Sequence, residues 1–263
     1  MTQTTKGWSP KAKARLAGVF QALEGFTSTF GQVMLLGRLI VVGDAAATAG
    51  NILTHEALFR LGFASSLFGV VFHLGWAFLF YQLLRPVNRS VSFCAVLVIL
   101  VGCAIQAVAA LLYLAPLLVL TAGSSLSALT EQQLQALAYM FLKLNGLAFD
   151  SYLVFFGLWC VLTGYLIFGS TFLPQILGVL LVIDGLGWMI YVSPPLGHKL
   201  FPIIAVASGL AEIPLQLWLL IFGVNNDRWK EQAAGMEKRN SVKSDGTRWQ
   251  RATDLSMRLP LFL

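Results

Sequence analysis

Apolar stretches long enough to cross a membrane recur six times along this chain. A membrane-spanning helix needs about 20 mostly apolar residues, because each residue rises about 1.5 Å through a hydrocarbon layer roughly 30 Å thick. Stretches that meet this requirement lie at residues 16–40, 59–84, 91–120, 146–169, 173–193 and 200–224. The chain is therefore predicted to be an all-α membrane protein built as a bundle of six transmembrane helices.

The composition agrees with a membrane environment. Of the 263 residues, 57% are hydrophobic and 11% are charged, whereas soluble globular domains carry about 25% charged residues. The stretch 16–40 is the weakest of the six, because polar residues interrupt it. It is too polar and too long for the apolar core of a signal peptide, and no small-residue cleavage site follows a short apolar run. We therefore expect it to be kept as a helix.

Basic residues predict the orientation of the bundle. Six spans would put three segments on the same side of the membrane: the residues before 16, the turn at 85–90 and the residues after 224. That side holds most of the Lys and Arg residues. The other side has four: Arg38, Arg60, Lys143 and Lys199. Because short cytoplasmic segments carry the excess of positive charge, both termini are predicted to be cytoplasmic, in the plasma membrane of a bacterium.

Two of the predicted outer connections look structured. Asp44 is a suitable N-cap for an alanine-rich helix over 43–53. Thr130 and Gln133 have the spacing of a capping box, and apolar residues then recur at helical period over 127–144. A helix running straight from there into the fourth span would be too long for one crossing, so a break is expected at Asn145–Gly146. Each connection is predicted to form a short helix at the outer interface.

The chain divides into three parts. Residues 1–14 are predicted to be a cytoplasmic segment, 15–225 the six-helix domain, and 226–263 a polar, basic cytoplasmic tail. The tail lacks apolar periodicity except at its last few residues, so it is predicted to be disordered. The net charge of +6 fits these basic ends next to a lipid bilayer, and we expect no nucleic-acid partner. The oligomeric state is not predicted.

Several polar side chains interrupt the apolar spans near their middle. A carboxylate at the bilayer centre costs at least about 2.5–3.5 kcal/mol, so such groups face the bundle interior and need a partner. Helical spacing puts each of them on the polar stripe of its span, which should point inward. The residues predicted to meet in one intramembrane polar cluster are Glu24, His73, Gln106, Asp184 and Glu212.

No Lys or Arg lies at the same depth to neutralise these acids. The acids could be protonated, share a proton with His73, bind a cation or face a water-filled cavity. Pro214 adds a feature beside Glu212, since a proline inside a helix leaves the carbonyl four residues earlier, that of Leu210, without its usual donor. Asp150 lies closer to the outer surface. It either forms an ion pair with Lys143, two turns away, or joins the central cluster.

Three classes of function remain open. The leading hypothesis is a protein that binds or translocates a proton, a cation or a small polar solute through the acidic cluster. The alternative is a non-catalytic membrane partner or sensor whose buried acids fix the helix register. An intramembrane enzyme is the least favoured, because phosphate-binding loops and nucleophile elbows are missing from the sequence. The three histidines are too few for two bis-histidine haems, and no cofactor is predicted.

Several segments together resemble a known family. They are "GDAAATAGNILTHEALFRLG" (43–62), "LLRPVNRS" (83–90), "EQQLQALAYMFL" (131–142), "DSYLVFFGLWCVLTGYLIFGSTFLPQILGVLL" (150–181) and "GLAEIPLQLWLLIFGVN" (209–225). They are similar, in this order, to a bacterial membrane family known as domain of unknown function 4386, and the resemblance covers roughly residues 13–225. It implies a compact bundle of membrane helices and no particular activity, and it leaves the tail outside.

Overall fold

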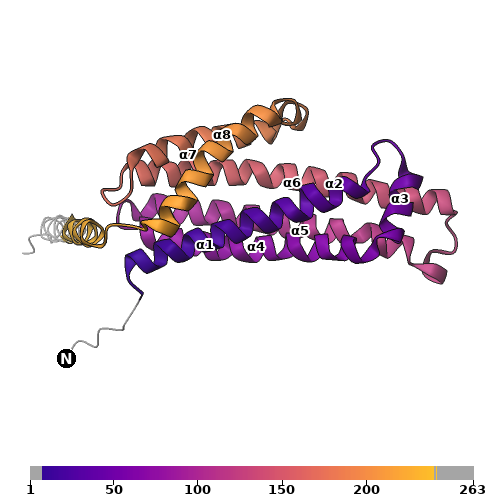
Figure 1. The fold of residues 1–263 in the computed structure, drawn as a ribbon, viewed down its shortest axis with the longest axis horizontal. Coiled ribbons are helices and arrows are strands. Elements are labelled where there is room, and N and C mark those ends of the chain that lie inside the picture. The colour runs from indigo at the N-terminus through magenta and orange to yellow at the C-terminus, as the bar shows by residue number, and fades with distance from the viewer. Residues whose placement is uncertain (1–7, 240, 242–263) are drawn as a thin grey trace, which may run out of the picture.

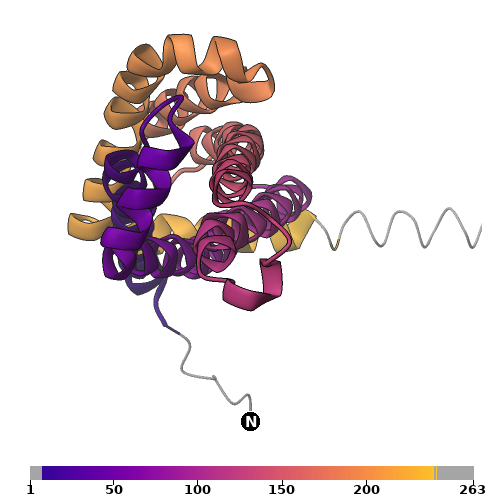
Figure 2. The same ribbon diagram turned by 90° about the vertical axis from the view of Figure 1, so that its right-hand side faces the viewer.

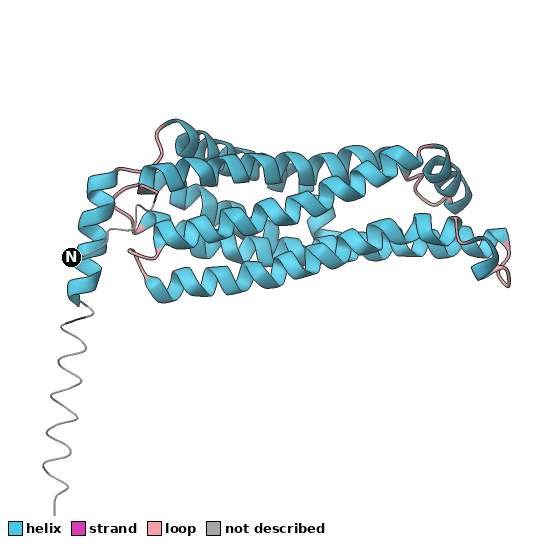
Figure 3. Cartoon of the chain, turned by 90° about the horizontal axis from the view of Figure 1, so that it is seen from below, coloured by secondary structure: helices cyan, strands magenta, loops and turns pink. Residues whose placement is uncertain are grey.

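The computed structural model describes residues 8–239 and 241, and it contains helices but no strand in this part of the chain (Figures 1 and 3). The elements in chain order are α1 (Pro10–Ser28), the π-helical η1 (Thr29–Leu35), α2 (Leu36–Leu39), α3 (Ala45–Thr54), α4 (Glu56–Leu84), α5 (Arg89–Leu120), the 3₁₀ turn η2 (Gly123–Leu126), α6 (Glu131–Phe168), α7 (Gln175–Met189), the 3₁₀ turn η3 (Ile190–Val192) and α8 (Pro194–Ile221).

Five of these helical segments are long and apolar enough to cross a membrane: Glu56–Leu84, Arg89–Leu120, Glu131–Phe168, Gln175–Val192 and Pro194–Ile221. Large apolar side chains are exposed along all of them, as expected where lipid rather than water surrounds the helices. The continuous helical stretch from Pro10 to Leu39 is not among the five. The chain is thus an all-α, multi-pass membrane protein.

The long helices form a closed ring in chain order. α1 packs against α4, and then α4 against α5, α5 against α6, α6 against α7 and α7 against α8, while α8 returns to contact α1 (Figure 2). We call the end with the start of α1 and the end of α8 the proximal end, and the end that carries α3 the distal end (Figure 1). At the proximal end the backbone N–H of Lys11 donates to Oδ1 of Asn226, which joins the two termini of the bundle.

Helix ends follow the local sequence. The side chain of Ser9 accepts from the N–H of Ala12 ahead of Pro10, and Asn88 caps α5 in the same way. The predicted caps at the distal end are also confirmed: Asp44 accepts from Ala47, and Thr130 and Gln133 form a reciprocal capping box. Both segments are helical, but the second is the start of the long helix α6 and not a separate short helix, while α3 packs on α6 and α5.

The predicted break at Asn145–Gly146 is wrong. α6 runs through these residues as one helix of 38 residues, about 57 Å long at 1.5 Å per residue. Asn145 is 1% exposed, and its side-chain N–H donates to the carbonyl of Ala109 on α5 at 2.7 Å. Asn145, which was predicted to mark the end of a helix, instead forms a hydrogen bond that joins α6 to the neighbouring helix α5.

Glycines hold α6 and α7 close together. A Cβ built on Gly157 would lie 2.5 Å from the carbonyl oxygen of Gly185, and one on Gly164 would lie 2.7 Å from that of Gly178. Small residues at this spacing let two membrane helices approach at backbone distance. These glycines are therefore packing positions between α6 and α7.

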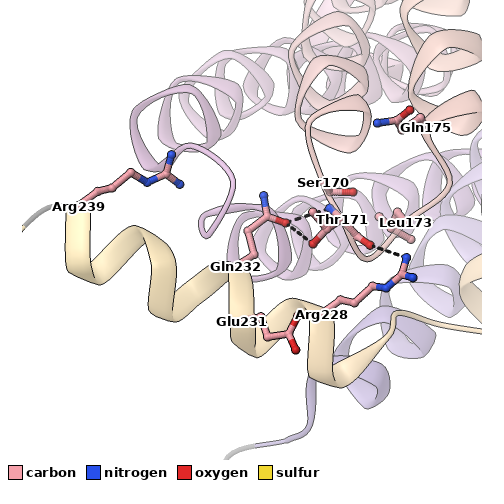
Figure 4. A pocket seen from close by; sticks show the side chains of 8 residues that line it. All are labelled: Ser170, Thr171, Leu173, Gln175, Arg228, Glu231, Gln232 and Arg239. Carbon is pink, nitrogen blue, oxygen red and sulfur yellow. Dashed lines mark hydrogen bonds between the residues drawn. The ribbon is translucent and has the colours of Figure 1, made fainter.

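The first part of the tail predicted at residues 226–263 is helical. Residues 226–239 form a helix that lies against the turn between α6 and α7. The side-chain oxygen of Gln232 accepts from the N–H and the hydroxyl of Thr171, and Arg228 donates to the carbonyl of Thr171 (Figure 4). The indole N–H of Trp229 donates to the carbonyl of Leu83. Local sequence pattern could not predict these contacts, because they join residues 226–239 to the turn between α6 and α7 and to the end of α4. Residues 240 and 242–263 lie outside the described residues.

Candidate functional site

Each long helix of the ring contributes at least one buried polar side chain. The set comprises Glu24 on α1, His73 on α4, Gln106 on α5, Tyr152 on α6, Asp184 on α7 and Ser208 on α8, all of them no more than 8% exposed. In an environment without water, such groups need partners inside the protein. Their contacts sort them into two groups.

The first group surrounds His73, which is fully buried. The hydroxyl of Tyr152 lies 3.1 Å from Nδ1 of His73, and Oε1 of Glu24 lies 3.8 Å from the same nitrogen. The other ring nitrogen, Nε2, has no hydrogen-bond partner among the described residues. The rings of Trp76, Phe156 and Trp159 enclose the imidazole.

Ser28 extends this group to α5. Its hydroxyl donates to Oε1 of Glu24 at 3.0 Å, and Nε2 of Gln106 donates to Oγ of Ser28 at 3.4 Å. Three of the predicted residues, Glu24, His73 and Gln106, therefore lie in one set of contacts that reaches across α1, α4 and α5.

The second group lies between α7 and α8. The hydroxyl of Ser208 donates to Oε1 of Glu212 at 2.7 Å. Asp184 is fully buried next to Ser208, Cys160 and Trp188. Neither of its carboxyl oxygens has a partner among the described residues at hydrogen-bonding distance and angle. Ser208 therefore lies next to both Asp184 and Glu212. The side chain of Glu212 is partly exposed.

Gln21 connects the two groups. It lies one turn before Glu24 on α1, and its side-chain N–H reaches the backbone carbonyl of Glu212 at 3.5 Å. The acceptor is therefore the carbonyl of Glu212. It is not the carbonyl of Leu210, which the sequence predicted to be left without a donor by Pro214. The structure therefore places all five predicted residues inside the ring, but in two neighbouring groups without a direct hydrogen bond between Glu24 and Glu212.

The predicted ion pair of Lys143 with Asp150 is not formed. Oδ2 of Asp150 lies 2.9 Å from Nε2 of His198, and the ammonium of Lys143 lies over the ring of Tyr139, 5.2 Å from its centroid. His198 was expected in a loop. α8 instead begins at Pro194, which carries His198 on its second turn to a position next to Asp150.

A cavity of about 610 Å³ opens at the distal side between α1–η1, α6, α7–η3 and α8. We call it the distal cavity. Its polar lining residues are Ser28, Thr29, Gln32, Asp150, Tyr191, His198 and Ser208. The serines that hold Glu24 and Glu212 are thus part of its wall, so each carboxyl lies one side chain away from the cavity. The π-helical η1 forms one side of it, and π-helical turns occur frequently at functional sites.

The described residues contain no group of three or more His, Cys, Asp or Glu side chains arranged to hold a metal ion. Among the described residues, the buried side-chain atoms without a hydrogen-bond partner are Nε2 of His73, the amide oxygens of Gln21 and Gln106, both oxygens of Asp184, and the indole nitrogens of Trp76 and Trp188. The carboxyl and amide oxygens among them are hydrogen-bond acceptors, so a donor is what they lack.

Sequence reasoning missed Tyr152 and His198 as site residues. Tyr152 belongs to an aromatic stretch of α6. Nothing in the local sequence indicates that its hydroxyl, unlike those of other tyrosines, contacts a buried polar group. His198 becomes relevant only because α7 and α8 bring it back onto α6. Ser28 and Ser208, in contrast, could be found from the sequence, since each lies four residues from a buried glutamate and hence on the same helix face.

Comparison with known proteins gives one positive result. No curated protein and no solved structure matches the chain significantly. A family model described as "Domain of unknown function (DUF4386)" matches residues 16–223, which include α1 from Leu16 onward, α4 to α8 in full and the polar residues of both groups. This match confirms the resemblance seen in the sequence: the chain belongs to the DUF4386 family.

Proposed function

We propose that this protein binds a proton or a small cation inside the ring of helices and moves it across the membrane, with the distal cavity as the route from one side. The observation that carries the proposal is the position of Ser28 and Ser208. Both line the distal cavity, and their hydroxyls donate to the carboxyls of Glu24 and Glu212. A cation in the cavity would therefore be one side chain away from two acidic groups.

The charge balance supports a positively charged ligand. No Lys or Arg of the described residues lies within 4 Å of Glu24, Asp184 or Glu212. A carboxylate near the middle of a bilayer costs at least about 2.5–3.5 kcal/mol without compensation. Since no Lys or Arg of the described residues compensates these acids, a proton or a bound cation would lower the cost of burying them.

The hydrogen bonds argue against a purely structural role for the two glutamates. Ser28–Glu24 and Ser208–Glu212 are both separated by four residues, so each bond lies within a single helix. Such bonds do not hold one helix against another, and the approach of Glu24 Oε1 to Nδ1 of His73 on α4, at 3.8 Å, is longer than a hydrogen bond. A sensor or partner protein whose acids only fix helix register would need these carboxyls to bond across helices, as Asn145 does between α6 and α5.

The proposal includes a sixth membrane crossing by residues 10–39, with both termini in the cytoplasm. Gln21 and Glu24 are buried on the inner face of α1, whereas Val19, Leu23 and Phe26 on other faces are exposed. The low average hydropathy of α1 is therefore explained by polar residues that face the ring rather than lipid. The start of α1, the end of α8 and the basic turn at 85–90 share the proximal end, which supports a cytoplasmic position for that end.

Flux measurements on reconstituted protein test the function. Proteoliposomes with a trapped pH-sensitive dye would be given an inward proton, Na⁺ or K⁺ gradient. We expect flux of at least one of these ions through the wild type and at least a tenfold loss in Glu24→Gln and Glu212→Gln, with melting temperatures close to that of the wild type. Glu131→Gln, at the exposed start of α6, is the matched control and should keep full flux. Absence of flux in the wild type, or equal flux in all variants, contradicts the proposal.

A further inference from the structure

The distal cavity is larger and less polar than a site for an inorganic ion. Its volume of about 610 Å³ lies in the range of sites for small organic molecules, about 300–1,000 Å³. Phe149, Leu153, Trp188 and Phe201 are among the side chains that line it. Sites for bare cations are instead surrounded by oxygen ligands. The cavity therefore has room and apolar surface for an organic ligand.

Aromatic rings form much of one wall. The ring centroids of Trp188 and Tyr191 lie 6.0 Å apart, and those of Tyr191 and His198 lie 5.4 Å apart in a T-shaped arrangement. The indole Nε1 of Trp188 has no hydrogen-bond partner among the described residues. The faces of Trp, Tyr and Phe rings attract cations, and groups of such rings recognise alkylammonium ions.

The wall carries one acidic group and no Lys or Arg. Asp150 is 6% exposed. Its Oδ2 contacts His198 at 2.9 Å, and its Oδ1 has no hydrogen bond in the described part of the chain. A carboxylate with a free oxygen beside aromatic rings is complementary to a ligand that combines a positive charge with alkyl groups.

We propose that the distal cavity binds an organic ammonium ion, with the charged nitrogen near Oδ1 of Asp150 and the alkyl groups against Trp188 and Phe201. This inference deepens the proposed function, on which it rests for the role of the cavity, by naming the class of ligand that the cavity accepts. The ammonium group could come from a free amine or from the headgroup of a membrane lipid, because the recognising chemistry is the same.

Calorimetric titration with choline tests the inference. The full chain would be placed in nanodiscs of phosphatidylglycerol, which lack amine headgroups. Saturable binding of choline is expected, with at least tenfold weaker binding of its neutral isostere 3,3-dimethylbutan-1-ol. Asp150→Asn and Trp188→Leu should each weaken choline binding at least tenfold, Asp150→Glu should restore most of it, and Glu131→Gln should bind like the wild type. Melting temperatures of all variants would show that the loss is not unfolding.

A second arm identifies the source of the ammonium group. If lipid supplies it, nanodiscs containing phosphatidylethanolamine should lower the apparent affinity for choline, whereas a site for free amines keeps its affinity. Either result supports the inference. No saturable choline binding, equal binding of the neutral isostere, or unchanged binding by Asp150→Asn overturns it.

Failure here is distinguishable from failure of the proposed function. Choline binding without proton, Na⁺ or K⁺ flux in the wild type would leave this inference intact and contradict the transport proposal. Flux that depends on Glu24 and Glu212, observed without choline binding, would support the transport proposal and contradict this inference.

Discussion

Two contacts between neighbouring helices of the ring differ in kind. α6 and α7 touch at backbone distance through Gly157, Gly164, Gly178 and Gly185. α1 and α8 touch through side chains at the proximal end and then separate around the distal cavity, where Ser28 and Ser208 line it from opposite helices. The first contact has the features of a fixed framework, and the second those of a place where a ligand is received.

The difference has a physical basis. Backbone-to-backbone contact leaves no side chain that can move, so an inserted atom must displace a whole helix. At the α1–α8 contact, Gly18 faces the side chains of Leu219 and Leu220, which can change rotamer. Two prolines inside α8, Pro202 and Pro214, also interrupt its hydrogen bonds. Identical substitutions at the two contacts should therefore have unequal effects.

The largest effect is expected for Gly157→Ala. The new Cβ would lie 2.5 Å from the carbonyl oxygen of Gly185 and 2.9 Å from the backbone nitrogen of Met189, so α6 and α7 must move apart. We expect a loss of about 3 kcal/mol or more in the free energy of unfolding, measured by denaturant titration in mixed micelles. Gly25→Ala is the control, because nothing lies within 4 Å of its added Cβ. Equal stability of the two variants would contradict a rigid α6–α7 contact.

An intermediate effect is expected for Tyr152→Phe. Tyr152 belongs to α6, yet its hydroxyl reaches His73 on α4, so it ties the α6–α7 framework to the group around Glu24. Its removal leaves a buried ring nitrogen without a partner, which costs about 1–3 kcal/mol. The same titration measures the loss, and the chemical shifts of the His73 imidazole should change with it. A stability equal to that of the wild type would show that the His73 group is independent of the framework.

The smallest effect is expected for Gly18→Ala. Its Cβ would meet the side chain of Leu220 at 3.0 Å, and alanine favours the helix over glycine by about 1 kcal/mol. These contributions oppose each other, so stability should stay within about 1 kcal/mol of the wild type. A loss as large as that of Gly157→Ala would mean that the α1–α8 contact is as rigid as the α6–α7 contact.

The features of the structure that depend on local sequence pattern could be predicted: the long helices, the helix starts and the polar residues that face inward. Apolar stretches identified every long helix, and Asp44, Thr130 and Gln133 identified helix starts, because caps act within a few residues. The polar stripes placed Glu24, His73, Gln106, Asp184 and Glu212 inside the ring. Ring closure by α8 on α1 and the pairing of Asp150 with His198 could not be read from the sequence. Both depend on how distant helices pack, and local spacing carries no information about that.

The error at Asn145–Gly146 illustrates the same limit. An Asn–Gly pair usually ends a helix, because both residues favour other conformations. Here the Asn side chain has a partner on α5, and the tertiary contact outweighs the local preference. The helical residues 226–239 are a second case, since their polar composition conceals the contacts of Arg228, Trp229 and Gln232 with the bundle.

The most direct test of the account is whether water reaches Ser208 from the distal side. In a variant whose native Cys94, Cys103 and Cys160 are replaced by alanine, Ser208→Cys would be exposed to a membrane-impermeant thiol reagent applied to either side of sealed vesicles. The account predicts rapid labelling from the distal side only, and labelling at least tenfold slower for Ser92→Cys, which is buried near the proximal end. If Ser208→Cys reacts no faster than Ser92→Cys, or reacts from the proximal side, the distal cavity is not the route to the buried acids.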